Sequence, residues 1–235
     1  MIKLTIAIMH CPYFEERKVM VQKIVNQLGN KNILEKLEDF AIIQDWKKKG
    51  VWPTAKKSWE FCLSTNATHH IVIQDDCIIC KDFIDSIQKC IETFPDRIIS
   101  LYANRKICED AKNKDIRWIQ MNDGMWGNAT LFPTNILKDF LVWQQKHLDQ
   151  KYFMDDSRYR IFCMMTKNYP LVTMPSFVDH GLPSDSCVGH NNKKRIARWF
   201  EKDKSYLEYD WSNKQMLYSN TTQMFTKDWR KYYYE

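Results

Sequence analysis

Short apolar runs alternate with amphipathic segments along the first two thirds of the chain. Apolar runs of strand length lie at residues 4–9, 40–43, 71–73, 98–102, 117–121 and 171–175. Between them, apolar residues at helical spacing predict helices over residues 15–28, 52–64, 83–94, 136–147 and 159–166. Strand–helix alternation of this kind predicts an α/β fold, with a mostly parallel central sheet sandwiched by helices.

Three stretches break this alternation. Residues 104–115 are polar and charged and predict a loop or lid, and residues 176–181 and 184–190 predict a polar loop with two histidines. The last stretch, residues 193–235, is rich in Tyr, Trp and Lys and has no clean period. We therefore expect one domain over residues 1–192 and an aromatic, basic C-terminal arm over residues 193–235 that packs on it.

Composition narrows the cellular context. No run of about 18 apolar residues exists to span a membrane, and residues 1–9 resemble a first strand rather than a signal peptide. We expect a cytoplasmic protein whose eight cysteines are free thiols. Cys77-x-x-Cys80 lacks a second metal-binding pair and is interpreted as apolar filling. The net charge of +6 favours an anionic partner such as a nucleotide, a nucleic acid or an acidic glycan.

Two adjacent carboxylates, Asp75 and Asp76, directly follow the apolar run at residues 71–73. Ligands of open α/β sheets bind at the carboxyl ends of strands, where paired acids suit a divalent cation that also carries phosphate. The plainer interpretation is a turn, or a cap for the helix that begins near Asp82.

Other candidate ligand-binding residues lie in loops after strands. His10, Tyr13 and Arg17 follow the first strand, where they either lie on the surface without a role or face a ligand, with Tyr13 stacking on a base and Arg17 contacting phosphate or base. Gly124, Trp126 and Gly127 form either a bulged hairpin or a wall that lets backbone approach a sugar closely.

A second acidic pair, Asp155 and Asp156, stands at the predicted start of a helix, where acids also serve as caps. Two late histidines, His180 and His190, lie in the loop after a strand, and a late histidine of this kind suits a metal whose other ligand is an early acid.

The order of these features resembles nucleotide-sugar glycosyltransferases of the GT-A fold, in particular small bacterial and phage types. The resemblance covers about residues 4–190 and excludes the tail. It rests on six pieces: the first strand with Arg17; Gly50-x-Trp52 with a helix bearing Trp59; His70-x-Val72-x-Gln74-Asp75-Asp76; Gly124-x-x-Gly127-x-Ala129 with Pro133; Met154-Asp155-Asp156; and Pro175-Ser176-Phe177-Val178-Asp179-His180.

The resemblance implies a Rossmann-like GT-A domain and a Mn²⁺ or Mg²⁺ ion that bridges the donor diphosphate. The family's first acid is replaced here by Gln74, so the resemblance points to Asp76 and His180 as metal ligands and leaves Asp75 to hold ribose or a metal-bound water. The family's later acid, a base or a sugar-orienting group, falls on Asp155 or Asp156. His10, Tyr13, Arg17, Asp75, Gly124, Trp126 and Gly127 are the expected donor-binding residues.

The implied activity is a hexosyl- or pentosyltransferase that uses a nucleotide-sugar donor, with a UDP-sugar as the first candidate. Phage enzymes of this type glycosylate hydroxymethylated DNA bases, and such an origin would place the protein in the host cytoplasm. The basic residues Lys193, Lys194, Arg195 and Arg198 suit contact with double-stranded DNA. The alternatives are a cell-surface glycan as acceptor, a non-catalytic nucleotide- or nucleic-acid-binding module, and a nuclease-type phosphoryl transferase. Whether the sugar carbon is inverted or retained, and the oligomeric state, stay open.

Overall fold

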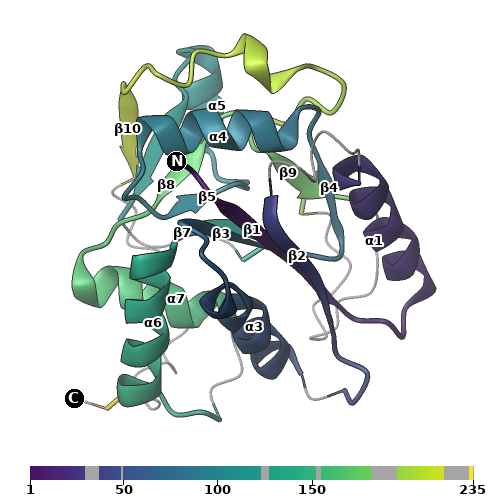
Figure 1. Cartoon of the computed structure of the whole chain (residues 1–235). Helices are drawn as coiled ribbons and strands as arrows, with labels where there is room; N and C mark the ends of the chain where they lie inside the picture. Colours follow the sequence, from purple (N-terminus) through teal and green to yellow (C-terminus); the bar gives the residue numbers. More distant parts are fainter. Residues whose placement is uncertain are drawn as a thin grey trace.

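An eight-stranded sheet runs through the middle of the protein, with helices on both of its faces (Figure 1). The structure is a computed structural model that describes residues 1–29, 37–48, 50–122, 127–151, 155–181, 195–219 and 233–234. The strand order is β10 (Met216–Ser219), β6 (Trp118–Met121), β8 (Leu171–Thr173), β5 (Ile99–Ser100), β7 (Ala129–Pro133), β3 (His69–Gln74), β1 (Leu4–His10) and β2 (Leu37–Gln44). A two-stranded sheet pairs β4 (Cys77–Ile79) with β9 (Val178–His180).

Parallel pairs form the majority of this sheet. Four pairings are parallel (β1–β2, β1–β3, β5–β8 and β6–β10), and three are antiparallel (β3–β7, β5–β7 and β6–β8). The helices are α1 (Glu15–Leu28), α3 (Val51–Glu60), α4 (Phe83–Thr93), α5 (Ile107–Asn113), α6 (Thr134–His147) and α7 (Asp155–Thr166), with short 3₁₀ turns at Phe61–Ser64 and Tyr206–Glu208. The prediction of a mostly parallel central sheet sandwiched by helices is confirmed.

Alternate residues of the central strands pack into two separate hydrophobic cores, because successive side chains of a strand point to opposite faces of the sheet. Leu4, Ile6 and Ile8 of β1 pack in the core that contains α1 and α4. Ala7 and Met9 of the same strand pack in the core that contains α3, α6 and α7. All residues of β1 are buried, which is typical of a central strand covered on both faces.

The core under α5 corrects one prediction. Residues 104–115 were expected to form a loop or lid, but residues 107–113 form α5. Cys108 and Ala111, three residues apart, are buried against Ile119 and Met121 of β6. This apolar stripe is too short to stand out among the surrounding charged residues, which explains why the helix was missed.

Two further expectations about loops were wrong. Residues 178–180 of the predicted polar loop form β9, which pairs with β4. The hairpin interpretation for the region around Gly127 also fails, because β7 pairs with β3 and β5 rather than with β6. The two buried cysteines of Cys77-x-x-Cys80 are free thiols, as are the other five cysteines among the described residues.

The C-terminal segment contributes to the core as well as to the sheet. Ala197, Tyr206 and Trp211 are buried in the same core as Phe177, and β10 adds an edge strand beside β6. Tyr233 and Tyr234 contact the end of α6, where the ring of Tyr233 stacks on His147 with centroids 5.9 Å apart. The predicted boundary at residues 192–193 lies outside the described residues and stays a prediction.

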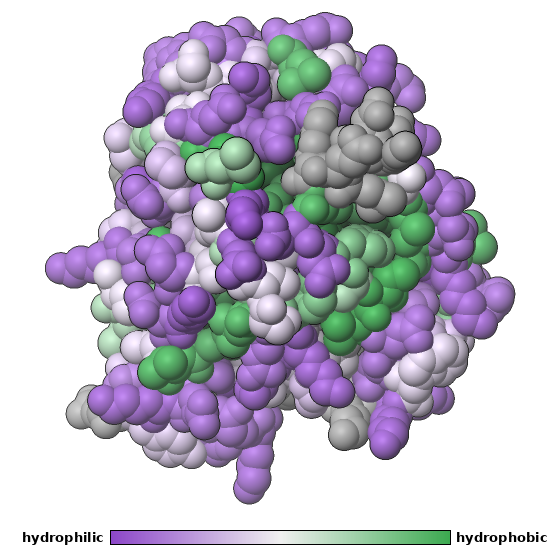
Figure 2. All heavy atoms as spheres, in the orientation of Figure 1, coloured by the Kyte–Doolittle hydropathy of each residue, from purple (hydrophilic) through white to green (hydrophobic). Residues whose placement is uncertain are grey.

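The surface in Figure 2 is mostly polar, with apolar side chains gathered on part of this face. The outermost strand β2 carries partly buried apolar residues, Leu37, Phe40 and Ile42, that pack against the core. Within the described parts of the chain, no helix combines the length and the apolar character that a membrane span requires.

Candidate functional site

The sheet changes winding direction between β1 and β3. The chain leaves β1 through α1 to reach β2 on one side, then crosses back through α3 to reach β3 on the other side of β1. The helices α1 and α3 accordingly pack on opposite faces of the sheet. In open α/β sheets the crevice outside the carboxyl ends of the strands at such a switch point is the usual ligand site. The carboxyl ends of β1 and β3 are His10 and Gln74, so the Asp75–Asp76 pair stands directly at this crevice.

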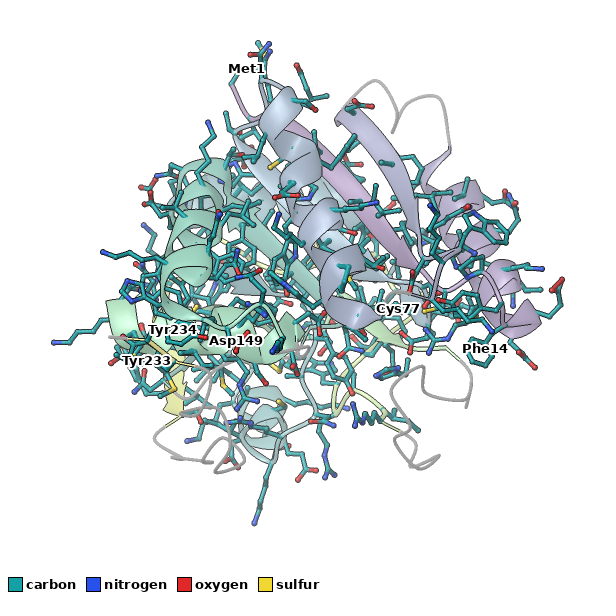
Figure 3. All side chains as sticks on the ribbon, turned by 90° about the horizontal axis from the view of Figure 1, so that it is seen from below. Met1, Phe14, Cys77, Asp149, Tyr233 and Tyr234 are labelled. Carbon is teal, nitrogen blue, oxygen red and sulfur yellow. The ribbon has the colours of Figure 1, made fainter. Side chains whose placement is uncertain are left out.

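The Asp75 carboxylate joins the two strands. Its Oδ2 atom accepts hydrogen bonds from His10 Nδ1 at 2.9 Å and from the backbone N–H of Cys11 at 2.6 Å. Its Oδ1 atom accepts from Arg17 Nη1 of α1. Both oxygens are therefore engaged by the protein, and the residue is only 2% exposed. Asp75 fixes the loop after β1 against the end of β3, and Figure 3 shows the labelled Phe14 and Cys77 of these segments on the same side of the molecule.

Arg17 also reaches the second acid. Its Nη2 atom donates to Asp76 Oδ2 at 3.1 Å, so one guanidinium group bridges both carboxylates. The Arg17 side chain is 7% exposed and the Asp76 side chain 15%. The bridge reduces the repulsion between two neighbouring acids that are largely removed from water.

Asp76 is the acid that retains binding capacity. Its Oδ1 atom is buried and has no hydrogen-bond partner among the described residues. His180 of β9 lies beside it, with Nδ1 3.7 Å from Asp76 Oδ2. The backbone holds this pair together because the N–H of Gly181 donates to the Asp76 carbonyl at 2.8 Å. An orphaned buried carboxylate oxygen next to an imidazole is suited to binding a cation.

The histidine ring can serve as a cation ligand through one of its two tautomers. The Asn128 amide lies 2.7 Å from His180 Nε2. With the amide nitrogen facing the ring, the proton of a neutral ring is on Nδ1. With the amide turned over, its oxygen accepts from Nε2–H, and the free Nδ1 lone pair faces Asp76. Metal-binding histidines commonly donate their second ring N–H to an oxygen in this way. Burial lowers the pKa of the His180 ring, which favours the neutral form that binds metals.

The described residues fit a hard divalent cation that the protein holds only in part. They contain no group of three His, Cys, Asp or Glu side chains able to hold a metal ion. Asp76 and His180 could supply two ligands, and Mg²⁺-type ions complete their shell with phosphate oxygens and water when they bind with a substrate. The site therefore fits a metal that arrives with, or is completed by, a phosphate-bearing ligand.

The second acidic pair is brought to the same end of the sheet. The side chain of Gln74, the last residue of β3, hydrogen-bonds to the Asp155 carboxylate at the start of α7. Gly127 lies between these elements. A Cβ atom at this position would lie 3.2 Å from Asp156 Cβ, 3.4 Å from Gln74 Nε2 and 2.9 Å from the Tyr159 hydroxyl. Gly127 thus packs its backbone against both β3 and α7, which is why a side chain has no room here.

The buried acid of this pair holds its proton unusually tightly. Burial, followed by repulsion from Asp156, raises the pKa of Asp155 from 3.8 to about 7. Asp155 is 6% exposed, whereas Asp156 is partly exposed. A carboxyl group that exchanges its proton near neutral pH is a candidate for acid–base work, or for holding a neighbour that does it.

The Tyr13 side chain connects the loops at the edge of the crevice through a hydrogen bond. Its hydroxyl donates to Asp45 Oδ2 at 2.9 Å, and the same oxygen accepts from the backbone N–H of Gly50 at 3.0 Å. The backbone N–H of Asp45 in turn donates to the His10 carbonyl. The loops after β1 and β2 are therefore joined next to the Asp75–Asp76 turn. The Lys48 ammonium lies 5.0 Å from the centre of the Tyr13 ring.

The structure brings most of the predicted donor and metal residues together, namely His10, Tyr13, Arg17, Asp75, Asp76, Gly127 and His180. Gly124, Trp126, Lys193, Lys194 and His190 lie outside the described residues. The other two residues predicted to contact DNA lie in different surroundings. Arg198 forms a 2.9 Å ion pair with Glu109 of α5, whereas Arg195 lies beside the crevice.

Three residues of the site were not predicted to act there: Asn128, Asp45 and Tyr102. The ring of Tyr102 packs edge-on against His180, with centroids 5.5 Å apart. Asp45 could have been found from the sequence, because it is a polar residue directly after the strand β2. Asn128 and Tyr102 are recognised as site residues only through their contacts with His180.

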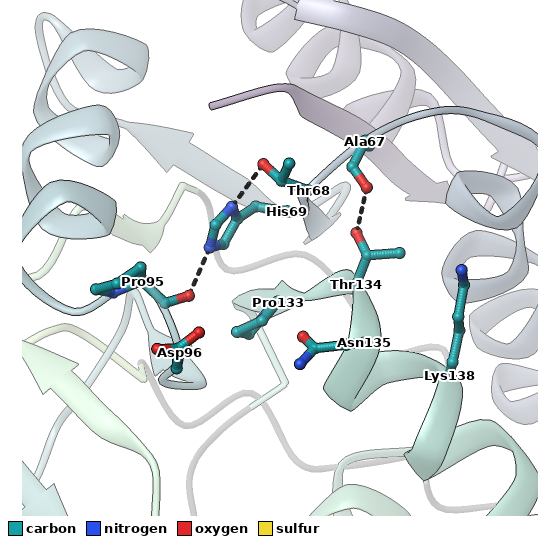
Figure 4. Close-up of a pocket in the computed structure, with 9 residues that line it drawn as sticks. All are labelled: Ala67, Thr68, His69, Pro95, Asp96, Pro133, Thr134, Asn135 and Lys138. Atoms are coloured by element: carbon teal, nitrogen blue, oxygen red, sulfur yellow. Dashed lines mark hydrogen bonds between the residues drawn. The ribbon is translucent and has the colours of Figure 1, made fainter. Parts of the chain in front are cut away.

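A second hollow lies at the opposite end of β3 (Figure 4). It measures about 410 Å³ and is lined by Ala67, Thr68, His69, Pro95, Asp96, Pro133, Thr134, Asn135 and Lys138. Its main polar groups are already paired, because the His69 ring lies between Thr68 Oγ1 and the Pro95 carbonyl, and the Thr134 hydroxyl donates to the Ala67 carbonyl. None of these lining residues carries a buried polar atom without a partner in the described part of the chain, unlike Asp76 at the crevice.

Comparison with known proteins gives only remote similarities. No protein-family model and no curated protein sequence matches the chain. Among solved structures, a mutant Drosophila β-1,4-galactosyltransferase 7, in complex with manganese, UDP-Gal and xylobiose, aligns with 77% of this chain and 71% of its own, at 10% identity and a TM-score of 0.46.

UDP-glucose pyrophosphorylase in complex with UDP-glucose aligns with 74% of this chain and 90% of its own, at 12% identity and a TM-score of 0.43. An S. aureus TarS fragment aligns with 73% of this chain at 9% identity and a TM-score of 0.48, and this chain covers 57% of that fragment. These similarities are too distant to carry an argument about function.

Proposed function

We propose that the protein is a metal-dependent glycosyltransferase that moves a sugar from a nucleoside-diphosphate donor, with a UDP-sugar as the first candidate, to an acceptor hydroxyl. The observation that carries the proposal is the meeting of two acidic pairs at one end of the sheet. Asp76, with its orphaned oxygen, stands at the switch point, and the Asp155–Asp156 pair is tied to the same strand end through Gln74. The first pair suits a metal–diphosphate group and the second suits proton transfer, and together they support group transfer to a hydroxyl.

The donor half of the site is assigned to the first pair. Asp76 and His180 would hold Mn²⁺ or Mg²⁺, which supplies Lewis-acid neutralisation of charge on the leaving diphosphate. Asp75 holds His10 and Arg17 in place and so orients the loop on which the donor would rest.

The acceptor half is assigned to the second pair. Asp156 is the proposed base because its side chain is partly exposed, and buried Asp155 positions it. The base takes the proton of the acceptor hydroxyl while that oxygen bonds to the anomeric carbon. The bond from that carbon to the phosphate oxygen breaks, and its electron pair leaves with the nucleoside diphosphate. Base catalysis in a single displacement of this kind implies inversion at that carbon.

For the acceptor we propose a hydroxymethylated base in duplex DNA. The support is the net charge of +6 and the adjacent basic residues Lys193 and Lys194. A cell-surface glycan is the competing acceptor. Transfer of labelled sugar to hydroxymethylated duplex, unmodified duplex and an oligosaccharide panel separates the two, since a DNA enzyme labels only the hydroxymethylated duplex.

The decisive experiment is a thermal-shift screen of nucleotide sugars with and without Mn²⁺, followed by an assay for nucleoside diphosphate release. A true donor raises the melting temperature by mass action, and more so with Mn²⁺. Binding without any release in the presence of acceptors would favour the non-catalytic module instead. A screen with no stabilising nucleotide sugar, with or without metal, contradicts the proposed function.

A further inference from the structure

One arginine beside the crevice has no acidic partner among the described residues. Arg17 pairs with Asp75 and Asp76, Arg117 with Asp115, and Arg198 with Glu109. Arg195, in contrast, forms no ion pair with a carboxylate in the described part of the chain. Its side chain is exposed and therefore accessible to a ligand. An arginine placed near a charged site without a carboxylate of its own is suited to an anionic ligand.

The backbone of Arg195 is anchored next to the candidate metal ligands. The buried Tyr102 hydroxyl donates to the Arg195 carbonyl at 2.9 Å, and the Tyr102 ring packs against His180. Two residues further on, the backbone N–H of Ala197 donates to Asp179 Oδ1 at 2.7 Å. Asp179 is the neighbour of His180 in β9, so both anchors attach this segment to the strand that carries His180.

These anchors place the start of the Arg195 side chain beside the crevice. The hydroxyl that holds the Arg195 carbonyl belongs to a tyrosine whose ring packs on His180. An arginine side chain that starts at this point is long enough to reach a ligand held between Asp76 and His180.

A charge count favours an anionic ligand only when Arg195 is included. Asp75, Asp76, Asp179 and Arg17 together leave two negative charges at the crevice. A divalent cation balances these two charges, and Arg195 adds one positive charge. The two phosphates of a nucleotide sugar carry one negative charge each, and departure of the sugar adds further negative charge to the diphosphate. Arg195 therefore supplies positive charge for the diphosphate that the metal and Arg17 do not leave over.

We propose that Arg195 binds the diphosphate of the donor and stabilises it as it leaves, rather than contacting DNA. The inference rests on the proposed function and adds to it a residue that the chain supplies from beyond β9. Its role is electrostatic and directional, because a guanidinium group offers two parallel N–H donors to phosphate oxygens.

The test is titration of UDP and of UMP, each with Mn²⁺, into the wild-type protein and into Arg195→Ala, Arg195→Lys and Lys202→Ala variants. Lys202→Ala removes one exposed positive charge from the same C-terminal segment and is the matched control. Because Arg195 and Lys202 are both exposed, the variants are expected to fold, and equal melting temperatures without ligand verify this.

The expected result is that Arg195→Ala weakens UDP binding by about tenfold or more and changes UMP binding much less. Arg195→Lys retains part of the affinity, and Lys202→Ala matches the wild type. Equal UDP affinity of the wild type and Arg195→Ala would overturn the inference and leave the proposed function intact. Loss of duplex-DNA binding with unchanged UDP binding would overturn it in favour of a DNA contact. A wild-type protein that binds no nucleoside diphosphate in a panel of the common bases would overturn the proposed function itself.

Discussion

His10 and Asp75, which are 65 residues apart in sequence, are joined by a 2.9 Å hydrogen bond between the ring Nδ1 and the carboxylate. The bond connects the ends of β1 and β3, the two strands between which the winding of the sheet reverses. It also separates the roles of the two adjacent acids. Asp75 is turned inward to His10, Cys11 and Arg17, and this leaves Asp76 as the acid with an unsatisfied oxygen.

This division of roles predicts a large stability loss for Asp75→Ala. The substitution removes the main partner of the Arg17 guanidinium, which is 7% exposed, and leaves a buried charge poorly compensated. Breaking a buried pair in this way costs about 3–5 kcal/mol of unfolding free energy, as measured by urea denaturation. The matched control is Glu15→Ala, which breaks the exposed pair between Glu15 and Lys18 and is expected to change stability little. Similar small losses for both variants would show that Asp75 does not hold the strand ends together.

Asp76→Asn is expected to act on ligand binding rather than on folding. Arg17 keeps its bond to Asp75 in this variant, so no buried charge is left without a partner. The variant should melt close to the wild type without ligand, yet lose most of the additional stabilisation that Mn²⁺ gives in the presence of a nucleoside diphosphate. Differential scanning fluorimetry measures both quantities. Undiminished Mn²⁺-dependent stabilisation in Asp76→Asn would exclude Asp76 as a metal ligand.

The position of this site was predictable from the chain, because an apolar run that ends in two acids marks a strand and its carboxyl end. The separate roles of Asp75 and Asp76 were not predictable. They depend on Arg17, 58 residues earlier, and on Asn128 and His180, which reach the turn only through the pairing of β3 with β7 and of β4 with β9. Local patterns carry no information about such distant contacts.

The same limit applies to the fold. Strands and helices with long apolar periods, such as β1 and α4, were found from the sequence, whereas the short helix α5 and the edge strand β10 were not. Residues 216–219 carry three large apolar or aromatic side chains in a row, but these resemble the rest of the aromatic tail. Only pairing with β6 makes them a strand.

The raised pKa of Asp155 predicts a pH-dependent difference in stability. The unfolded carboxyl ionises near pH 3.8, whereas the folded one holds its proton up to about pH 7. The folded state therefore binds more protons in this window, and the contribution of Asp155 to stability falls as pH rises from about 4 to about 7. Asp155→Asn carries no such charge, so its stability relative to the wild type should rise across this window by an amount on the order of 2–4 kcal/mol.

Chemical denaturation of both proteins at several pH values between 4 and 8 measures this difference. Asp156→Asn is the informative companion, because it removes the repulsion that contributes to the raised pKa of Asp155. The pH dependence of that variant should be flatter than that of the wild type. A constant difference between Asp155→Asn and the wild type from pH 4 to pH 8 contradicts a shifted pKa at this position.

Gly127→Ala is expected to disturb the contact between the two acidic pairs. The added methyl carbon would lie 2.9 Å from the hydroxyl of the buried Tyr159 ring, which has little freedom to move, and 3.2 Å from Asp156 Cβ. Overpacking of this kind costs about 1–3 kcal/mol, and displacement of Asp156 should also slow nucleoside diphosphate release.

A double-mutant cycle shows whether the clash is the cause. Tyr159→Phe removes the hydroxyl that the new methyl group would meet, so Gly127→Ala should cost less in the Tyr159→Phe background than in the wild type. The contact with Asp156 remains in the double variant, and the rate of product release should therefore recover less fully than stability does. Strictly additive losses in the cycle would mean that Gly127 does not pack against the ring, and that its effect on the site arises elsewhere in the loop.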